Sequence, residues 1–224
     1  MANNKLVSEI IRQRIIEDNG QFFANDNIAD YIQDGELELL KAELESKFSG
    51  VLDTLVIDTT HDHNTQETAK RLAKMYIEEV FSGRYNKKPS ITEFPNYKNL
   101  QQIYTLGPIT IRSACSHHLV PITGEVYIGI IPSDKVIGIS KFARLTNWVM
   151  NRPHIQEEAV IMLADEIEKA VQPLGIAIML SATHMCMTWR GVKDNDVKMN
   201  NIFYRGVFET DTRLQQQFMQ VIKI

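Results

Sequence analysis

Two short clusters of thiol and imidazole side chains lie about 70 residues apart in this chain, at residues 115–118 (Cys-Ser-His-His) and 184–186 (His-Met-Cys). The chain has 2 cysteines and 6 histidines, and both cysteines and three of the histidines fall inside these clusters. Thiolate and imidazole are ligands that zinc prefers in proteins. If the clusters form one site, the fold must bring two distant segments to the same place.

Cys115 and His118 lie three residues apart at an expected junction of strand and turn, so both can bind one ion, with Cys186 as the third ligand. A catalytic zinc takes three protein ligands and keeps one position open for water. His117 and His184 would then lie close to the metal and be free to move protons. The clusters therefore predict a catalytic zinc site with two proton carriers beside it.

The two cysteines have other interpretations, namely a buried pair in the core or a disulfide. A structural zinc fits less well, because such sites are normally closed by four ligands. The N-terminus does not resemble an export signal, and thiols of proteins that stay inside the cell are normally reduced. We therefore favour metal binding or catalysis, and we expect a cytoplasmic protein.

Length and charge limit the class of protein. At 224 residues the chain can form one sizeable core with an appended helical segment. No apolar run approaches the roughly 18 residues that a membrane helix needs, so no membrane partner is expected. The formal net charge of -4 argues against broad nucleic-acid binding. A small anionic substrate is compatible with this charge if basic side chains gather locally.

Hydrophobic spacing predicts that the first third of the chain is helical. Helices are expected at residues 5–17, 35–49 and 64–81, followed by a linker loop at 89–99. Residues 61–64 (His-Asp-His-Asn) could be imagined as a metal site. Asn64 and Glu67 have the spacing of a capping box, however, so a loop that ends in a helix cap is the favoured interpretation.

From residue 100 the chain becomes rich in β-branched and aromatic residues, which favour strands. The expected order is two strands, two helices, two strands and a last helix, at 103–114, 120–131, 140–151, 155–171, 176–190, 202–209 and 211–222. This order predicts an α+β fold, with a four-stranded antiparallel sheet and two helices on one face (ββααββ), after an N-terminal helical region. The expected domains are residues 1–99 and 100–224.

Basic side chains gather near the second cluster. Alternation along the strand expected at 176–190 would place Arg190 on the same face as His184. Lys141 and Arg144 could add positive charge from the helix expected to begin near residue 140. Each of these is most simply a surface charge, but together they indicate a phosphate-binding site, for which arginine is well suited.

Gln156 and Glu157 lie at the start of the second core helix. A carboxylate that faces a pocket can accept two N–H bonds from a guanine-type edge, so Glu157 is a candidate for base recognition. The simpler interpretation is a carboxylate in the first helical turn, stabilised by the helix dipole.

Several of these segments together resemble GTP cyclohydrolase I. The resemblance lies in residues 68–76, 115–121, 136–144, 156–157 and 184–192, in the order and spacing of that family. It extends from about residue 64 to the C-terminus. It implies a tunnelling fold, in which the sheets of several subunits join into a barrel, and a homodecamer with active sites between subunits.

The resemblance also implies a role for each matching residue. The zinc ligands would be Cys115, His118 and Cys186. The contacts to the guanine and ribose of GTP would be Gln156, Glu157 and Ser140. The contacts to the triphosphate would be Lys141, Arg144 and Arg190, together with Arg71 and Lys74 of a neighbouring subunit.

The implied reaction opens the imidazole ring of GTP. Zinc would lower the pKa of its bound water from about 16 to about 7, which gives hydroxide at neutral pH. His184 would protonate the imidazole ring so that hydroxide attacks carbon 8, and His117 would be the second proton carrier. Ring opening would release formate, and the ribose would then rearrange and reclose to give 7,8-dihydroneopterin triphosphate.

Three positions and one segment depart from the family pattern. Ser116 stands where Glu is usual, Ala69 where Pro is usual and Glu158 where Arg is usual. Residues 193–200 replace a stretch that is usually rich in Ser and Thr. These departures leave the metal and proton groups intact, and they bear on substrate affinity and allosteric contacts.

Two rival functions make different demands on the sequence. A zinc deaminase needs His-x-Glu and Pro-Cys-x-x-Cys, and neither occurs in this chain. A decameric scaffold or regulator that binds a pterin or purine without turnover has no need for two spare proton carriers. His117 and His184 therefore favour the enzyme, and release of formate from GTP would distinguish the two.

Overall fold

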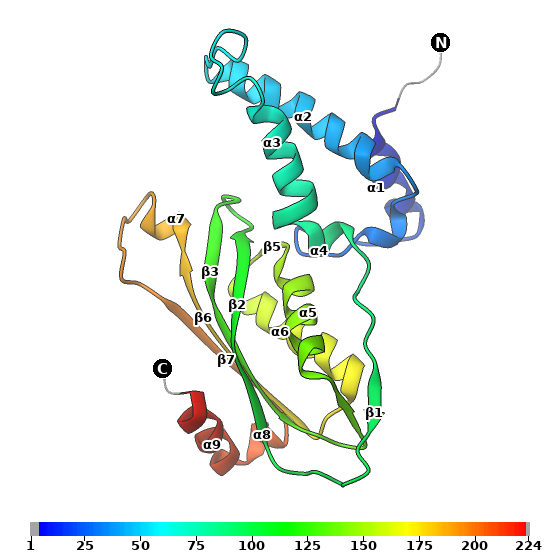
Figure 1. Ribbon diagram of the computed structural model, residues 1–224, viewed down its shortest axis with the longest axis vertical. Coiled ribbons are helices and arrows are strands. Elements are labelled where there is room, and N and C mark those ends of the chain that lie inside the picture. The colour runs from blue at the N-terminus through cyan, green and yellow to red at the C-terminus, as the bar shows by residue number, and fades with distance from the viewer. Residues whose placement is uncertain (1–4, 223–224) are drawn as a thin grey trace. The chain divides into compact units, whose positions relative to one another are not determined.

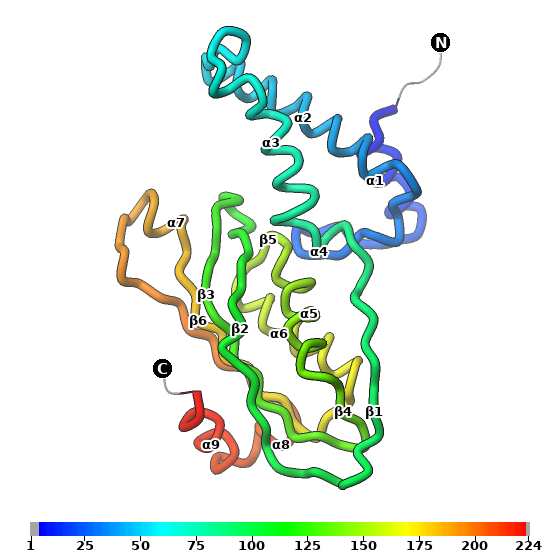
Figure 2. The backbone as a smooth tube through the Cα atoms, in the orientation of Figure 1, coloured from blue at the N-terminus to red at the C-terminus, as the bar shows by residue number. Residues whose placement is uncertain are grey.

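Helices make up the first part of the chain and a β-sheet dominates the second in the computed structural model, which describes residues 5–222 (Figures 1 and 2). Internal contacts divide the chain into an N-terminal unit up to Lys87 and a C-terminal unit from Lys88. The predicted α+β composition is thus confirmed, while the predicted domain limits, 1–99 and 100–224, stay a prediction. No helix between residues 5 and 222 combines the length and the apolar character that crossing a membrane requires.

The N-terminal unit consists of helical segments. They are α1 (Val7–Glu17), the 3-10 helix η1 (Ala29–Tyr31), α2 (Glu36–Thr54), α3 (Thr68–Lys74), the π-helix η2 (Met75–Val80) and α4 (Ser82–Tyr85). The helices predicted at 5–17 and 35–49 are confirmed. The capping box predicted at Asn64 is wrong, because α3 begins only at Thr68 and no side chain caps it. The side chain of Asn64 instead donates to Asp62 in the preceding turn, at 3.1 Å.

A small core and one ion pair hold the N-terminal unit together. Ile11, Ile15 and Ile28 form the buried core. Arg14 on α1 donates two hydrogen bonds, each of 2.6 Å, to the carboxylate of Glu36 at the start of α2. Bidentate pairs of this kind are stronger than single neutral hydrogen bonds. The hydrogen bonds from Arg14 hold the pKa of Glu36 below its ordinary value, although burial opposes them.

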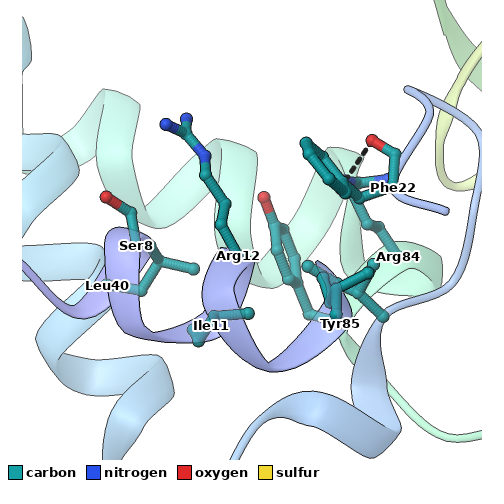
Figure 3. Close-up of a pocket in the computed structure, with 9 residues that line it drawn as sticks. Ser8, Ile11, Arg12, Phe22, Leu40, Arg84 and Tyr85 are labelled. Carbon is teal, nitrogen blue, oxygen red and sulfur yellow. Dashed lines mark hydrogen bonds between the residues drawn. The ribbon is translucent and has the colours of Figure 1, made fainter. Parts of the chain in front are cut away.

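A pocket of about 420 Å³ opens beside α1 in the N-terminal unit (Figure 3). Its lining residues are Ser8, Ile11, Arg12, Ile15, Phe22, Ile28, Leu40, Arg84 and Tyr85. Arg84 donates to the backbone carbonyl oxygens of Phe22, Ala24 and Asp26, and Figure 3 marks the bond to Phe22. Arg84 therefore ties the loop that follows α1 to α4.

The C-terminal unit is built on a sheet with the strand order β5, β2, β3, β6, β7. Its long strands are β2 (Tyr104–Cys115), β3 (Pro121–Ile131), β6 (Gly175–His184) and β7 (Met199–Gly206). Consecutive long strands pair antiparallel, as the sequence predicted. The structure adds β5 (Pro153–His154), a strand of 2 residues that runs parallel to β2. The simple ββααββ order is therefore interrupted by a short strand between the two core helices.

Helices lie on both faces of this sheet (Figure 1). The first face carries α5 (Ile139–Met150) and α6 (Gln156–Val171), which match the two helices predicted there. The second face carries α8 (Val207–Thr210) and α9 (Thr212–Ile222), and the predicted last helix corresponds to α9.

Strand β6 contributes side chains to a core on each face of the sheet, because successive side chains of a strand point to opposite faces. Ile178 and Leu180 belong to the large core that includes residues of α5 and α6. Ala177 and Met179 belong to a second core together with Phe218 of α9. The first part of β6 is therefore buried on both sides, which explains its nearly continuous apolar sequence from Gly175 to Leu180.

The strand predicted at 176–190 is wrong beyond His184, where the short helix α7 (Met185–Thr188) begins. Strand β3 starts at Pro121, and the last pair between β3 and β6 joins Ile122 to His184. Beyond this pair β6 has no partner on β3, so its backbone is free to leave the extended conformation.

Two further predictions need correction. The strand predicted at 202–209 instead runs from Met199 to Gly206, whose φ of 65° lies in the left-handed region and turns the chain out of the sheet. The loop predicted at 89–99 contains β1 (Glu93–Pro95), which pairs antiparallel with β4 (Lys135–Ile137). The pairing of β1 with β4 depends on contact with a distant segment rather than on local sequence.

We predict that Phe218→Ala lowers the free energy of unfolding by about 3–5 kcal/mol, because it empties a fully buried aromatic site. The ring packs edge-on against Phe208, with centroids 6.4 Å apart, and a Cβ atom at Gly129 would meet it at 2.7 Å. Urea unfolding followed by circular dichroism measures the loss. The control is Val221→Ala on the same helix, which is 58% exposed and should change stability by no more than about 0.5 kcal/mol. Equal effects of the two variants would contradict the assigned packing.

We predict that Glu36→Gln destabilises the protein at neutral pH and has a much smaller effect in acid. The pKa of Glu36 is lowered in the folded state, so its pair with Arg14 stabilises the fold above the unfolded pKa of about 4.3. That stabilisation disappears as the pH falls through the folded value. Urea unfolding at about pH 7 and about pH 3 measures the difference. Glu45→Gln is the control, since Glu45 makes no ion pair within residues 5–222, and a pH-independent effect of Glu36→Gln would refute the prediction.

Candidate metal centre and active site

Strand register brings the two cysteine and histidine clusters to the same end of the sheet. Strand β3 lies between β2 and β6, and Ile122 of β3 pairs with Ser113 on one side and with His184 on the other. Cys115 ends β2, two residues beyond Ser113. Figure 1 shows the ends of β2 and β6, with α7, at one end of the sheet.

The turn that follows β2 is held by its own backbone. The N–H of Leu119 donates to the carbonyl oxygen of Cys115 at 2.8 Å, and the N–H of Cys115 donates to the carbonyl oxygen of Val120 at 2.9 Å. Leu119 has a φ of 54°, which closes the turn. The N–H of Ser116 donates to the carbonyl oxygen of His154 in β5 at 3.0 Å. This tight turn directs the cluster to the end of the sheet.

Cys115, His118 and Cys186 form the predicted ligand set, and their candidate ligand atoms all lie within 4.8 Å of one another. Cys115 Sγ lies 4.0 Å from His118 Nδ1. Both cysteines are free thiols, so the alternative of a disulfide does not hold. Two sulfurs and one imidazole nitrogen are the donor types that zinc prefers, and three protein ligands are typical of a catalytic site.

The two neighbouring thiols also favour the binding of a cation. Burial raises the pKa of the Cys186 thiol, the negative charge of Cys115 and a hydrogen bond with it raise the pKa further, and Arg190 opposes these effects. Two neighbouring thiolates repel each other unless a positive charge lies between them. A bound divalent metal favours the deprotonated form of both, so the donor set suits such an ion.

His117 and His184 lie beside this cluster. His117 is exposed, and its Nδ1 lies 3.8 Å from Cys115 Sγ. His184 is half-buried, and its Nε2 lies 2.7 Å from Gln156 Oε1. Burial lowers the pKa of His184, and the charge of Glu157 partly opposes that effect.

Gln156 and Glu157, both expected to contact a base, differ sharply in exposure. Gln156 is 2% exposed, and its Nε2 donates to the carbonyl oxygens of Leu180 at 3.3 Å and Met199 at 2.9 Å. Glu157 is exposed in the first turn of α6. The hydrogen bond between Gln156 and His184 had no signal in the sequence, because it joins residues 28 positions apart.

The expected phosphate contacts Lys141 and Arg144 lie on α5, and Arg190 lies two residues beyond the end of α7. Arg190 follows α7 rather than continuing a strand, so the predicted alternation is wrong, yet its NH1 donates to His118 Nε2 at 2.8 Å. Lys141 donates to the carbonyl oxygen of Ser90 at 3.1 Å, and Arg144 is exposed on α5.

Three other predicted contact residues are all exposed. Ser140 lies in the first turn of α5, whose N-cap residue is Gly138, so the predicted cap at Ser140 is wrong. Arg71 and Lys74 lie on α3 of the N-terminal unit.

The structure adds a buried histidine, His154, near the site. No pattern in the sequence singles out this residue. It is 2% exposed, its Nε2 donates to the carbonyl oxygen of Val149 at 2.6 Å, and its Nδ1 has no protein partner among the described residues. Burial lowers its pKa to about 4, so the ring is neutral at pH 7. A strand of 2 residues between two helices is too short to give a sequence pattern.

Comparisons with known proteins agree on one family. The model of the family described as GTP cyclohydrolase I matches residues 44–223. GTP cyclohydrolase 1 of Rickettsia typhi is 36% identical over 70% of this chain and 83% of its own length. The enzyme of Vibrio vulnificus (strain YJ016) is 32% identical over 82% of this chain and 84% of its own length. That of Flavobacterium johnsoniae is 29% identical over 100% of this chain and 98% of its own length.

One solved structure, the archaeosine synthase QueF-Like in the apo form, shows a weaker likeness. The match covers 54% of this chain and 97% of the QueF-Like chain, with 18% sequence identity and a TM-score of 0.36.

We predict that the purified protein contains about one zinc ion per chain, and that Cys115→Ser and Cys186→Ser each lose most of it. A chelator should lower the melting temperature of the unaltered protein and leave that of the two variants nearly unchanged, because a ligand stabilises only the state that binds it. Elemental analysis and thermal unfolding measure the two effects. The control is His63→Asn, which changes the loop at residues 61–64 that could be imagined as a metal site. This variant should keep the full zinc content. Full zinc content in either cysteine variant would place the ion elsewhere.

Proposed function

The chain belongs to the GTP cyclohydrolase I family, and from this premise we propose that it opens the imidazole ring of GTP at carbon 8 in a zinc-dependent reaction. The products are formate and 7,8-dihydroneopterin triphosphate. Family membership supports GTP cyclohydrolase activity. The observation that carries the finer proposal is the cluster of Cys115, His118 and Cys186, with two histidines beside it that are not needed as ligands.

Cys115, His118 and Cys186 hold the zinc ion in this proposal. The chemistry that zinc supplies when bound is Lewis acidity, which lowers the pKa of water from about 16 to about 7. His118 would take part through Nδ1, which lies 4.0 Å from Cys115 Sγ, while Arg190 NH1 donates to its Nε2 at 2.8 Å. Arg190 can only donate to Nε2, whereas a histidine that binds a metal through Nδ1 carries its hydrogen on Nε2, so metal binding requires Arg190 to leave this nitrogen.

His184 and His117 move protons during the reaction. His184 protonates the imidazole ring of the substrate, which makes carbon 8 electrophilic, and His117 is the second proton carrier. The partial burial of His184 supports this role, because burial favours the neutral form and makes the charged ring a stronger acid. Carbon 8 leaves as formate, after which the ribose rearranges and the ring recloses.

The remaining residues bind GTP. Glu157 accepts N–H bonds from the guanine edge, and its exposure supports this role. The ribose lies near Ser140. The triphosphate contacts are Lys141, Arg144 and Arg190, together with Arg71 and Lys74 of a neighbouring subunit. Gln156 belongs to the base-binding region, although its side-chain bonds are to the protein.

The proposed assembly is a homodecamer of the tunnelling fold, with active sites between subunits. Strand β7 has a sheet neighbour on one side only among the described strands, so its outer edge can pair with a second copy. An open strand edge of this kind is normally covered or paired in a native protein. Arg71 and Lys74, exposed on α3, are available to a neighbouring copy.

We predict that the purified chain releases formate from GTP, and that His184→Asn and His117→Asn each reduce kcat by about 10²–10⁴-fold. Both variants should keep their zinc, because neither histidine belongs to the ligand set. Formate release and zinc content are measured on the same preparations. His63→Asn, far from the cluster in sequence, should leave the rate unchanged. A zinc-loaded protein that releases no formate would favour the silent pterin- or purine-binding regulator instead.

A further inference from the structure

We propose that Gln156 is a positioning residue for His184, which fixes the ring and its tautomer so that Nδ1 is the nitrogen through which His184 acts. This inference rests on the proposed function, because it assigns a new role within the same site. It also differs from the role expected for Gln156, since the side chain serves a histidine rather than the guanine.

The orientation of the Gln156 amide is set by two backbone carbonyl groups. Its Nε2 lies 3.3 Å from the carbonyl oxygen of Leu180 and 2.9 Å from that of Met199. A carbonyl oxygen only accepts hydrogen bonds, so the two N–H groups of the amide must face these oxygens. The reversed amide would place Oε1 against two other oxygens. Oε1 is therefore the atom that faces His184.

The orientation of this amide in turn fixes the tautomer of His184. Gln156 Oε1 can only accept, and His184 Nε2 lies 2.7 Å from it. Nε2 must therefore carry a hydrogen for this bond to form. In the neutral ring the lone pair is then on Nδ1, since a neutral imidazole has one donor and one acceptor nitrogen. Nδ1 is left to interact with the reactants.

The surrounding fold places Gln156 where its amide can support the ring of His184. The last pair between β6 and β7 joins Ala182 to Met199, so His184 lies beyond the region where β7 supports β6. Leu180 and Ala182 point to the face that carries α6, and alternation places His184 on the same face. Gln156, buried at the start of α6, therefore bridges the two strands where they separate and holds the ring there.

Binding of guanine by the same amide would require these bonds to break. All the polar atoms of the Gln156 side chain have partners within the protein. A buried polar group that loses its partner costs about 1–3 kcal/mol. Glu157, the next residue, is exposed and has no such constraint. The two neighbouring residues therefore have different roles: Gln156 orients His184, and Glu157 is available to the substrate.

The first test is steady-state kinetics of Gln156→Met, which keeps the length of the side chain and removes its hydrogen bonds. We expect kcat to fall about 10- to 100-fold with KM within about threefold, because the ring is misplaced while substrate contacts remain. The matched comparison is Glu157→Gln, which should mainly raise KM. A raised KM with unchanged kcat in Gln156→Met would overturn the proposal and restore base binding.

The second test observes the tautomer directly. Solid-state NMR of sedimented, zinc-loaded protein labelled with ¹⁵N-histidine reports which nitrogen of each ring carries hydrogen, and His184→Asn identifies the signals of His184. We expect hydrogen on Nε2 in the unaltered protein and a loss of this single tautomer in Gln156→Met, with zinc content unchanged. Hydrogen on Nδ1, or an unchanged spectrum in Gln156→Met, would overturn the proposal. Because this measurement needs no turnover, absence of formate release would refute the proposed function separately.

Discussion

The hydrogen-bond register of the central strand β3 is the constraint on which the candidate site depends. Its residue Ile122 pairs with both Ser113 and His184, and this alignment brings the two clusters of cysteine and histidine to the same end of the sheet. A slip of one residue would turn every side chain of β6 to the opposite face and remove His184 from Gln156. Gly124 secures the alignment, because a Cβ atom there would meet the carbonyl oxygen of Ser181 at only 2.1 Å. The meeting of the two clusters of cysteine and histidine is thus a consequence of close strand packing nearby.

The parts of the fold that the sequence predicted are those that depend on local signals. The strands that became β2 and β3 follow from β-branched residues, and α5 and α6 follow from apolar residues at helical spacing. The choice of Cys115, His118 and Cys186 followed from residue type, since few residue types bind zinc, and from the three-residue spacing of Cys115 and His118. The structure brings these three side chains together although more than 65 positions separate His118 from Cys186. Residue type and period were sufficient for both conclusions.

The parts that the sequence did not predict depend on which backbone groups a distant segment leaves free. The strand predicted to continue to residue 190 ends at His184, because β3 begins at Pro121 and offers β6 no further hydrogen-bonding partner. The short strand β5 exists because the end of β2 can accept a parallel neighbour at Pro153 and His154. The bond between Gln156 and His184 requires both the carbonyl oxygens that orient the amide and the end of β6. None of these features has a local pattern.

The dipeptide Gln156–Glu157 shows how helix geometry can divide two tasks between neighbours. Successive side chains on a helix point about 100° apart, so one enters the core while the other faces outward. Gln156 holds the ring of His184 in place from the buried side, and the charge of Glu157 raises the pKa of the same ring while burial lowers it. The position of His184 and the charge that it carries are therefore controlled by two adjacent residues with opposite environments. Exchanging the two residues would leave a buried carboxylate beside two carbonyl oxygens, which is an unfavourable arrangement. Their order along the helix is thus determined by the backbone that surrounds them.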